Sequence, residues 1–269
     1  MHLRSGGLAG HRFPLIWRRS ILSNGLVRMS KHPVIRSACT LPVLALALAL
    51  GATAQAQEAA GPAPVSVDQL PPEQEVSQTV IELAGWVVAA KDNHGYPFAV
   101  IDKAAAQVLV FDGDGRLQGA APGLFGSAVG DHTAPGIAGL ALREIPGRDR
   151  TTPAGRFVGG YGPSLDAGRV LWVDYESAVS IHPTAPGLPA ERRAERLASS
   201  TPDDNRVTHG CINVAPSFYE QVVRSTFQRG GIFYILPDRA AMADTFPDFA
   251  QSRAAGNSKG TRRSKGAGK

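Results

Sequence analysis

Short runs of β-branched and aromatic residues, separated by turn-forming residues, constrain the fold of this chain more than any other feature. Such runs occur at residues 98–101, 108–111, 170–173, 179–181 and 232–236, with shorter ones from 117 and at 157–158. Gly, Asp or Pro interrupts them, and the 269 residues include 30 Gly and 20 Pro. This pattern predicts short strands joined by turns, with the runs at 98–101, at 108–111 and from 117 as consecutive antiparallel strands. We therefore expect a mainly β fold with few helices.

Two segments instead show helical periodicity. Apolar residues recur at helical spacing between Ser77 and Lys91, and Pro216 suits the first turn of a helix that reaches about Phe227. Residues 126–150 lack periodicity and predict a surface loop, whereas the charged residues of 189–205 predict a short exposed helix inserted in the fold. The DGDG sequence at 112–115 lacks the remainder of a calcium loop and predicts a hairpin turn.

The first 56 residues have the features of a leader. The apolar run Leu41–Leu50 follows two basic residues and precedes Ala54-Gln55-Ala56, a small-x-small cleavage site. Ten apolar residues are too few to cross a hydrocarbon core of about 30 Å as a helix. We expect a signal peptide cleaved after Ala56, with Met29 as an alternative start. The mature protein would then lie in the periplasm or cell envelope, without a permanent membrane span.

Formal charge is unevenly distributed along the chain. The net charge of +5 arises from the ends, because residues 57–249 carry 15 basic and 23 acidic residues, a net of −8. This balance gives no reason to expect nucleic acid as a partner. Residues 57–75, rich in Ala, Pro and Gln, predict a linker, 76–96 an N-terminal helix and 238–269 a flexible basic tail.

A single thiol remains after leader cleavage. Loss of the leader removes Cys39 and leaves Cys211, so an internal disulfide is excluded. An exported lone thiol is buried and inert, paired between chains, or used chemically. Cys211 follows Gly210, whose missing side chain lets the backbone approach a bound carbonyl, so that the N–H groups of Gly210 and Cys211 can face an oxyanion. The helix starting near Pro216 would favour negative charge on the sulfur.

A nucleophilic thiol needs a base, and the mature chain offers four histidines. These are His94, His132, His182 and His209. His182 ends a predicted strand, where its side chain would be held rigidly, and His209 is the weaker candidate for the proton acceptor. His182 and Cys211 would thus meet from distant sequence positions, as the base and the nucleophile do in enzymes that form covalent intermediates. Zinc ligation by His and Cys is the rival interpretation, but paired-ligand spacing is missing, so we expect no metal.

Three motifs in order resemble the L,D-transpeptidase (YkuD-like) catalytic domain family. In chain order they are the strand pair at 100–102 and 107–111, the segment Thr152-Pro153-Ala154-Gly155-Arg156-Phe157, and His182 followed by Thr208-His209-Gly210-Cys211-Ile212-Asn213. The resemblance covers about residues 97–237 and implies a β-sandwich or open-barrel catalytic domain. It implies Cys211 as nucleophile and His182 as base, without a cofactor. Thr208, His209, Gly210 and Asn213 would support the site or its oxyanion hole.

The implied reaction belongs to peptidoglycan biosynthesis and cell shape. By this resemblance the enzyme forms a thioester with a peptidoglycan stem peptide and passes it to a second stem or to an envelope-protein amine. A hydrolase on the same scaffold, either amidase or carboxypeptidase, and an inactive peptidoglycan-binding module remain alternatives. The chain departs from the family pattern in three places. Pro183 follows the histidine where Gly is usual, and the 29-residue separation of His182 from Cys211 is consistent with an insertion at 189–205. Asn213 replaces the commoner Arg, so the substrate contacts of that Arg are not implied for this chain.

Overall fold

The computed structural model describes residues 76–164, 168–185 and 187–255, and within them the fold is mainly β, as predicted. The expected leader at 1–56 and linker at 57–75 lie outside the described residues. The nine strands are β1 (Phe98–Asp102), β2 (Gln107–Phe111), β3 (Leu117–Gly126), β4 (Gly155–Ser164), β5 (Gly168–Asp174), β6 (Val179–Pro183), β7 (Arg206–Thr208), β8 (Ile212–Val214) and β9 (Gly231–Ile235). The domain expected at 97–237 thus spans β1 to β9.

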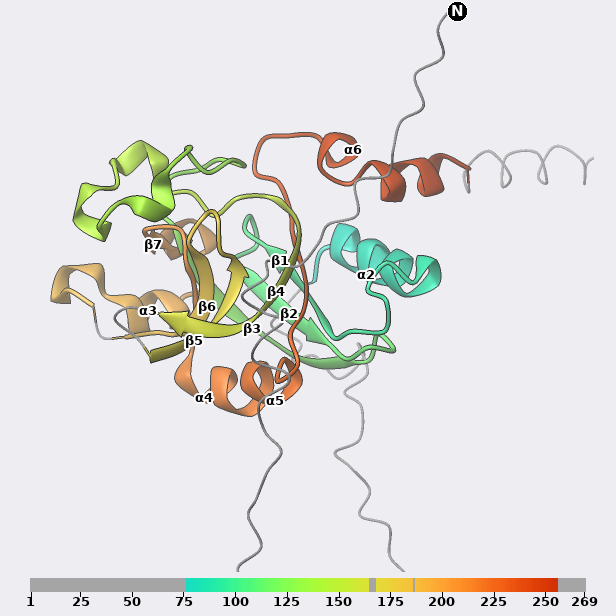
Figure 1. Cartoon of the computed structure of the whole chain (residues 1–269), viewed down its shortest axis with the longest axis horizontal. Helices are drawn as coiled ribbons and strands as arrows, with labels where there is room; N and C mark the ends of the chain where they lie inside the picture. Colours follow the sequence, from blue (N-terminus) through green and yellow to red (C-terminus); the bar gives the residue numbers. More distant parts are fainter. Residues whose placement is uncertain (1–75, 165–167, 186, 256–269) are drawn as a thin grey trace, which may run out of the picture. The chain divides into compact units, whose positions relative to one another are not determined.

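The strands form one mixed sheet that closes on itself (Figure 1). Their order is β2-β1-β9-β4-β5-β6-β8-β3-β7, and β3 also pairs with β2, so that eight of the nine strands complete a circuit. The predicted β1–β2 hairpin is antiparallel, whereas β1 pairs with β9 in parallel. Strand β3 serves both sides of the closure, because its first half pairs with β2 and its second half with β8 and β7.

Helices cover both faces of the β1–β2–β9 region, which explains why every residue of these strands is buried. Helix α2 (Gln78–Ala90) packs Leu83 and Val87 against one face. On the other face lies a continuous helical segment whose Tyr219, Val223 and Phe227 enter the second apolar cluster. This segment starts at Pro216, as predicted, and comprises α4 (Pro216–Phe218), the π-helix η7 (Tyr219–Val223) and α5 (Arg224–Thr226).

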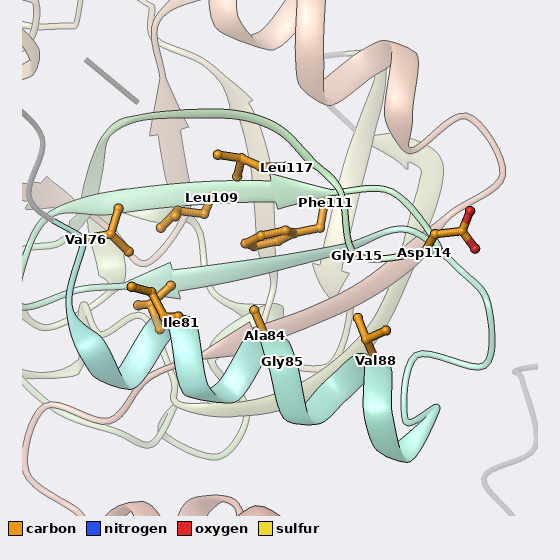
Figure 2. A pocket seen from close by; sticks show the side chains of 11 residues that line it. Val76, Ile81, Ala84, Gly85, Val88, Leu109, Phe111, Asp114, Gly115 and Leu117 are labelled. Atoms are coloured by element: carbon orange, nitrogen blue, oxygen red, sulfur yellow. The ribbon is translucent and has the colours of Figure 1, made fainter. Parts of the chain in front are cut away.

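Helix α2 begins and ends close to the predicted positions. The Ser77 hydroxyl caps it by accepting from the N–H of Val80, and Lys91 ends it in the left-handed conformation with φ of 55°. Between α2 and the β2–β3 hairpin lies an apolar hollow of about 340 Å³ (Figure 2). Ile81, Ala84 and Val88 line its helical side, as the figure shows. The residues that line it do not include the thiol or any histidine.

The segment predicted as a flexible tail from residue 238 is partly ordered. Helix α6 (Met242–Thr245) is followed by further helical residues up to 255, and Phe246 and Phe249 are buried against α2 and β9 side chains. Two aromatic rings three positions apart bury enough apolar surface to hold this segment to the domain. Residues 256–269 lie outside the described residues.

Two irregular segments follow the prediction more closely. Residues 126–150 contain three single-turn 3₁₀ helices, η2 (Ile137–Gly139), η3 (Leu142–Glu144) and η4 (Gly147–Asp149). The insertion at 189–205 holds η5 (Pro189–Glu191), η6 (Pro202–Asn205) and the short helix α3 (Arg193–Ala198), which has no buried residue. No helix in the described part of the chain has the length and apolar character needed to cross a membrane.

Candidate active site

Parallel pairing of β6 with β8 places His182 and Cys211 on one face of the sheet. The register sets Ile181 opposite Ile212 and His182 opposite Asn213. Both isoleucines are fully buried in the core. Because side chains alternate along a strand, Ser180 and His182 on β6 face the other way, as do Asn213 on β8 and Cys211 immediately before it. The two residues that the sequence assigned as nucleophile and base are therefore brought together.

The Cys211 sulfur lies among polar groups from the neighbouring strand. Its Sγ is 3.5 Å from the Ser180 hydroxyl and 3.6 Å from the carbonyl oxygen of Ala178. Burial raises the pKa of Cys211, but hydrogen bonds with His182 and Ser180 outweigh it and bring that pKa below its ordinary value. Sequence reasoning missed Ser180, although its position two residues before His182 on a strand indicates a shared face.

The pKa of His182 shifts in the opposite direction. Burial lowers it, yet the hydrogen bond and charge attraction with Cys211 raise it above its ordinary value. A lowered thiol pKa beside a raised imidazole pKa favours proton transfer from sulfur to ring. The site can therefore hold a thiolate beside an imidazolium, the form of cysteine that attacks carbonyl carbon.

Both ring nitrogens of His182 have neighbours that restrict its orientation. Nδ1 is 3.0 Å from the carbonyl oxygen of Pro183, and Nε2 is 2.9 Å from Nδ2 of Asn213. A carbonyl oxygen can only accept, so Nδ1 carries a proton. The predicted support residue Asn213 thus contacts the base directly, and Pro183 contributes its carbonyl.

Gly210 adopts a conformation that few other residues tolerate. Its φ is +132°, and a Cβ on it would lie 2.8 Å from the carbonyl oxygen of Thr151. The Gly210 N–H donates to the Thr208 hydroxyl at 3.1 Å, and that hydroxyl donates to the Cys211 carbonyl at 2.6 Å. In this structure the N–H of Gly210 is thus engaged within the motif. The sequence predicts that the Gly210 N–H faces an oxyanion. In this arrangement it faces the Thr208 hydroxyl instead.

A buried polar chain supports the Gly210 backbone from behind. The Thr152 hydroxyl donates to the Gly210 carbonyl at 2.8 Å, and the Lys103 ammonium donates to the Thr152 carbonyl at 2.9 Å. The Lys103 side chain is fully buried and forms ion pairs with Asp131 at 3.1 Å and Asp238 at 3.2 Å. Thr152 belongs to the second sequence motif, whose contact with the thiol segment the sequence did not reveal.

The loop 126–150 forms one wall of a narrow cleft at the thiol. Apolar side chains of this loop face the β5–β6 turn and the sulfur across about 50 Å³ of space. They are Ile137, Leu140, Leu142 and Ile145. His209 lines the same cleft, and its pKa is lowered by burial and by Arg150, so that its ring is neutral at neutral pH. The lowered pKa makes His209 a weaker proton acceptor than His182, whose pKa is raised.

The remaining candidates do not converge on the thiol. His132 is exposed, and the contact it makes with Thr151 is through its backbone carbonyl, which accepts from the Thr151 hydroxyl. His94 lies in the turn after α2. Within the described ranges, no three His, Cys, Asp or Glu side chains cluster so as to hold a metal ion.

Comparisons with known proteins bear on the fold. No protein-family model and no curated protein sequence matches the chain. Solved structures do match: an L,D-transpeptidase from Mycobacterium smegmatis aligns over 52% of this chain and 58% of its own, at 16% identity and a TM-score of 0.31. The helical cell shape determining protein of Campylobacter jejuni aligns over 54% and 49%, at 16% identity and a TM-score of 0.37.

An L,D-transpeptidase from Mycobacterium tuberculosis aligns over 52% of this chain and 57% of its own, at 15% identity and a TM-score of 0.32. The chain thus spans between 49% and 58% of the length of these three solved chains.

Proposed function

We propose that this protein is an exported cysteine acyltransferase of the L,D-transpeptidase type, acting on peptidoglycan stem peptides. One observation carries the proposal: Cys211 and His182 lie on one face of paired parallel strands, with pKa shifts that favour a thiolate beside an imidazolium. The Ser/Thr-His-Gly-Cys motif and its order relative to the other motifs supply the substrate class. Export rests on the leader, so the periplasm or cell envelope is part of the proposal.

The reaction follows from the positions of these groups. The Cys211 sulfur gives its proton to Nε2 of His182, from which the Asn213 N–H withdraws in this step, and attacks the carbonyl carbon of the third stem residue. The N–H of Cys211 would stabilise the oxyanion, while Gly210 and Thr208 hold that segment in shape. His182 returns the proton to the departing D-alanine amine, which leaves a thioester. An acceptor amine then attacks the thioester and loses its proton to His182, and the thiolate leaves.

The proposal is tested by incubating the mature chain, residues 57–269, with purified tetrapeptide muropeptides and separating the products by mass. Cross-linked dimers with released D-alanine are expected. Trimmed monomers alone would instead identify a carboxypeptidase. Neither product, together with no covalent adduct after exposure to a carbapenem, would identify an inactive peptidoglycan-binding module.

The Cys211→Ser variant is the matched control, because it replaces only the sulfur atom, by oxygen. It should keep its thermal unfolding temperature and lose all turnover, since a serine hydroxyl at this site is not ionised by His182. Turnover equal to that of the unmodified protein would end the claim that Cys211 is the nucleophile. An envelope protein as acceptor is tested by adding a lysine-terminated acceptor peptide and looking for its conjugate with the stem.

A further inference from the structure

The insertion at 189–205 reaches the candidate active site through one side chain. Helix α3 has no buried residue, so apolar packing does not explain its position. Its arginines instead make inward polar contacts, as with Arg196, whose Nε donates to the Glu191 carbonyl at 2.6 Å. The Arg193 side chain is 13% exposed, and its Nε pairs with Glu191 at 2.8 Å. Its Nη1 donates to Oδ1 of Asn213 at 2.9 Å, which connects the insertion to β8.

This contact determines which way the Asn213 amide points. A guanidinium offers only donors, so the Asn213 atom that faces Arg193 is the oxygen. The amide nitrogen then faces Nε2 of His182, at 2.9 Å. Without Arg193 the amide is free to rotate by half a turn and present its oxygen to the ring instead. Arg193 therefore acts on His182 without touching it.

The orientation of the amide matters because it presents N–H to the lone pair of Nε2. Nδ1 already carries a proton toward the Pro183 carbonyl, so this arrangement favours the neutral ring. The positive charge of Arg193 acts in the same direction and lowers the pKa of His182, against the effect of Cys211. The titratable groups that face the ring are thus Cys211 and Arg193, with Glu191 and His209 beside Arg193.

We propose that Arg193 is a positioning residue for His182. Through Asn213 it fixes the tautomer of the imidazole and disfavours its protonated form, so the insertion sets the pH range in which the ring exchanges protons with Cys211. The inference rests on the proposed function only in taking His182 as the base for Cys211.

The test follows His182 itself by nuclear magnetic resonance of the mature chain labelled with ¹⁵N-histidine. Ring-nitrogen shifts report the tautomer and the titration midpoint, and His182 is assigned from the signal missing in His182→Gln. In Arg193→Ala the midpoint should move to higher pH, because a cation that opposes ring protonation is gone, and the Nδ1-protonated tautomer should lose its predominance. Arg193→Lys, which keeps the positive charge, should bring the His182 midpoint part of the way back to that of the unmodified protein.

Arg192→Ala is the control, because Arg192 is 67% exposed and pairs with Glu195 on the surface. It should leave both the midpoint and the tautomer unchanged. In an Asn213→Ala background no amide oxygen can turn to the ring, so adding Arg193→Ala to it should not change the tautomer. Superimposable His182 titrations for the unmodified protein and Arg193→Ala would overturn the proposal, as would an equal effect of Arg192→Ala.

Activity provides a second readout that separates this proposal from the proposed function. If muropeptides are cross-linked, the pH profile of kcat in Arg193→Ala should shift to higher pH together with the His182 midpoint, with little change in KM. Cross-linking without a shift of the His182 midpoint would refute the role of Arg193 alone. A shift of the midpoint without cross-linking would leave that role standing and refute the transpeptidase proposal.

Discussion

Replacement of Lys103 by Met should destabilise the domain more than any surface substitution, because Lys103 balances two buried carboxylates. The ammonium donates to the carbonyl oxygens of Gly130 and Thr152 at 2.9 Å each, in addition to its ion pairs with Asp131 and Asp238. Methionine fills a similar volume but supplies none of these contacts. Arg206 still pairs with Asp238 at 2.6 Å, so the uncompensated charge falls on Asp131.

Removing one member of a buried ion pair costs about 3–5 kcal/mol, because the remaining charge stays out of water. For a domain of this size that loss lowers the unfolding temperature by about 10 °C. Urea unfolding monitored by tryptophan fluorescence measures the free energy directly. Arg116→Met is the matched control, since Arg116 is 55% exposed and its ion pair with Asp114 should contribute less than about 1 kcal/mol.

The same substitution should also slow acylation of Cys211. Lys103 holds the Thr152 backbone, and the Thr152 hydroxyl holds the Gly210 carbonyl next to the nucleophile. A loss of stability for Lys103→Met no larger than that of Arg116→Met would refute the reasoning, because it would mean that the buried carboxylates do not depend on the ammonium. Equal carbapenem acylation rates in a folded variant would refute the link to the thiol.

Three further predictions concern acid stability, backbone strain and the thiolate. Burial would raise the pKa of Asp131, but three backbone N–H groups and Lys103 lower it from 3.8 to about 2, so it contributes about 2 kcal/mol of stability above pH 4 that disappears as pH falls through 2. Unfolding in urea across this range should show the loss, and Asp131→Asn should lack it. Gly210→Ala should abolish acylation, because a Cβ would clash with the Thr151 carbonyl, whereas Gly139→Ala, with open space around it, should not change the rate. Ser180→Ala should raise the pKa of Cys211 and slow its alkylation by iodoacetamide at pH 7 about fivefold; an unchanged rate would exclude a hydrogen bond from Ser180 to sulfur.

The features predictable from sequence are those with a local signal. The β1–β2 hairpin, helix α2 and the helical segment starting at Pro216 follow from periodicity and turn residues within about 15 positions. The pairing of β3 with β8 and β7 has no such signal, because it joins segments about 80 to 90 residues apart. In the tail, the high content of Gly, Lys and Arg hid Phe246 and Phe249, whose spacing indicates a helix with one apolar side.

The candidate site divides in the same way. The pair of His182 and Cys211 could be proposed because the residues around Cys211 form a compact motif and His182 ends a run typical of a strand. Ser180 could have been added from strand alternation alone. The contact of Arg193 with Asn213 could not, because it depends on how an exposed helix folds back over the sheet. Likewise, only coordinates place the Thr208 hydroxyl where it engages the Gly210 N–H.

The parallel register of β6 and β8 has a consequence for how this chain can vary. Hydrogen bonds between the strands hold nucleophile and base on the same face of the sheet, so the connection between them can change in length without moving either one. Residues 184–205 are then free to acquire new contacts, as Arg193 has done, while the spacing of the two reacting groups stays constant. Lengthening or trimming this connection would therefore be a route to altering the working pH of the protein while leaving its chemistry intact.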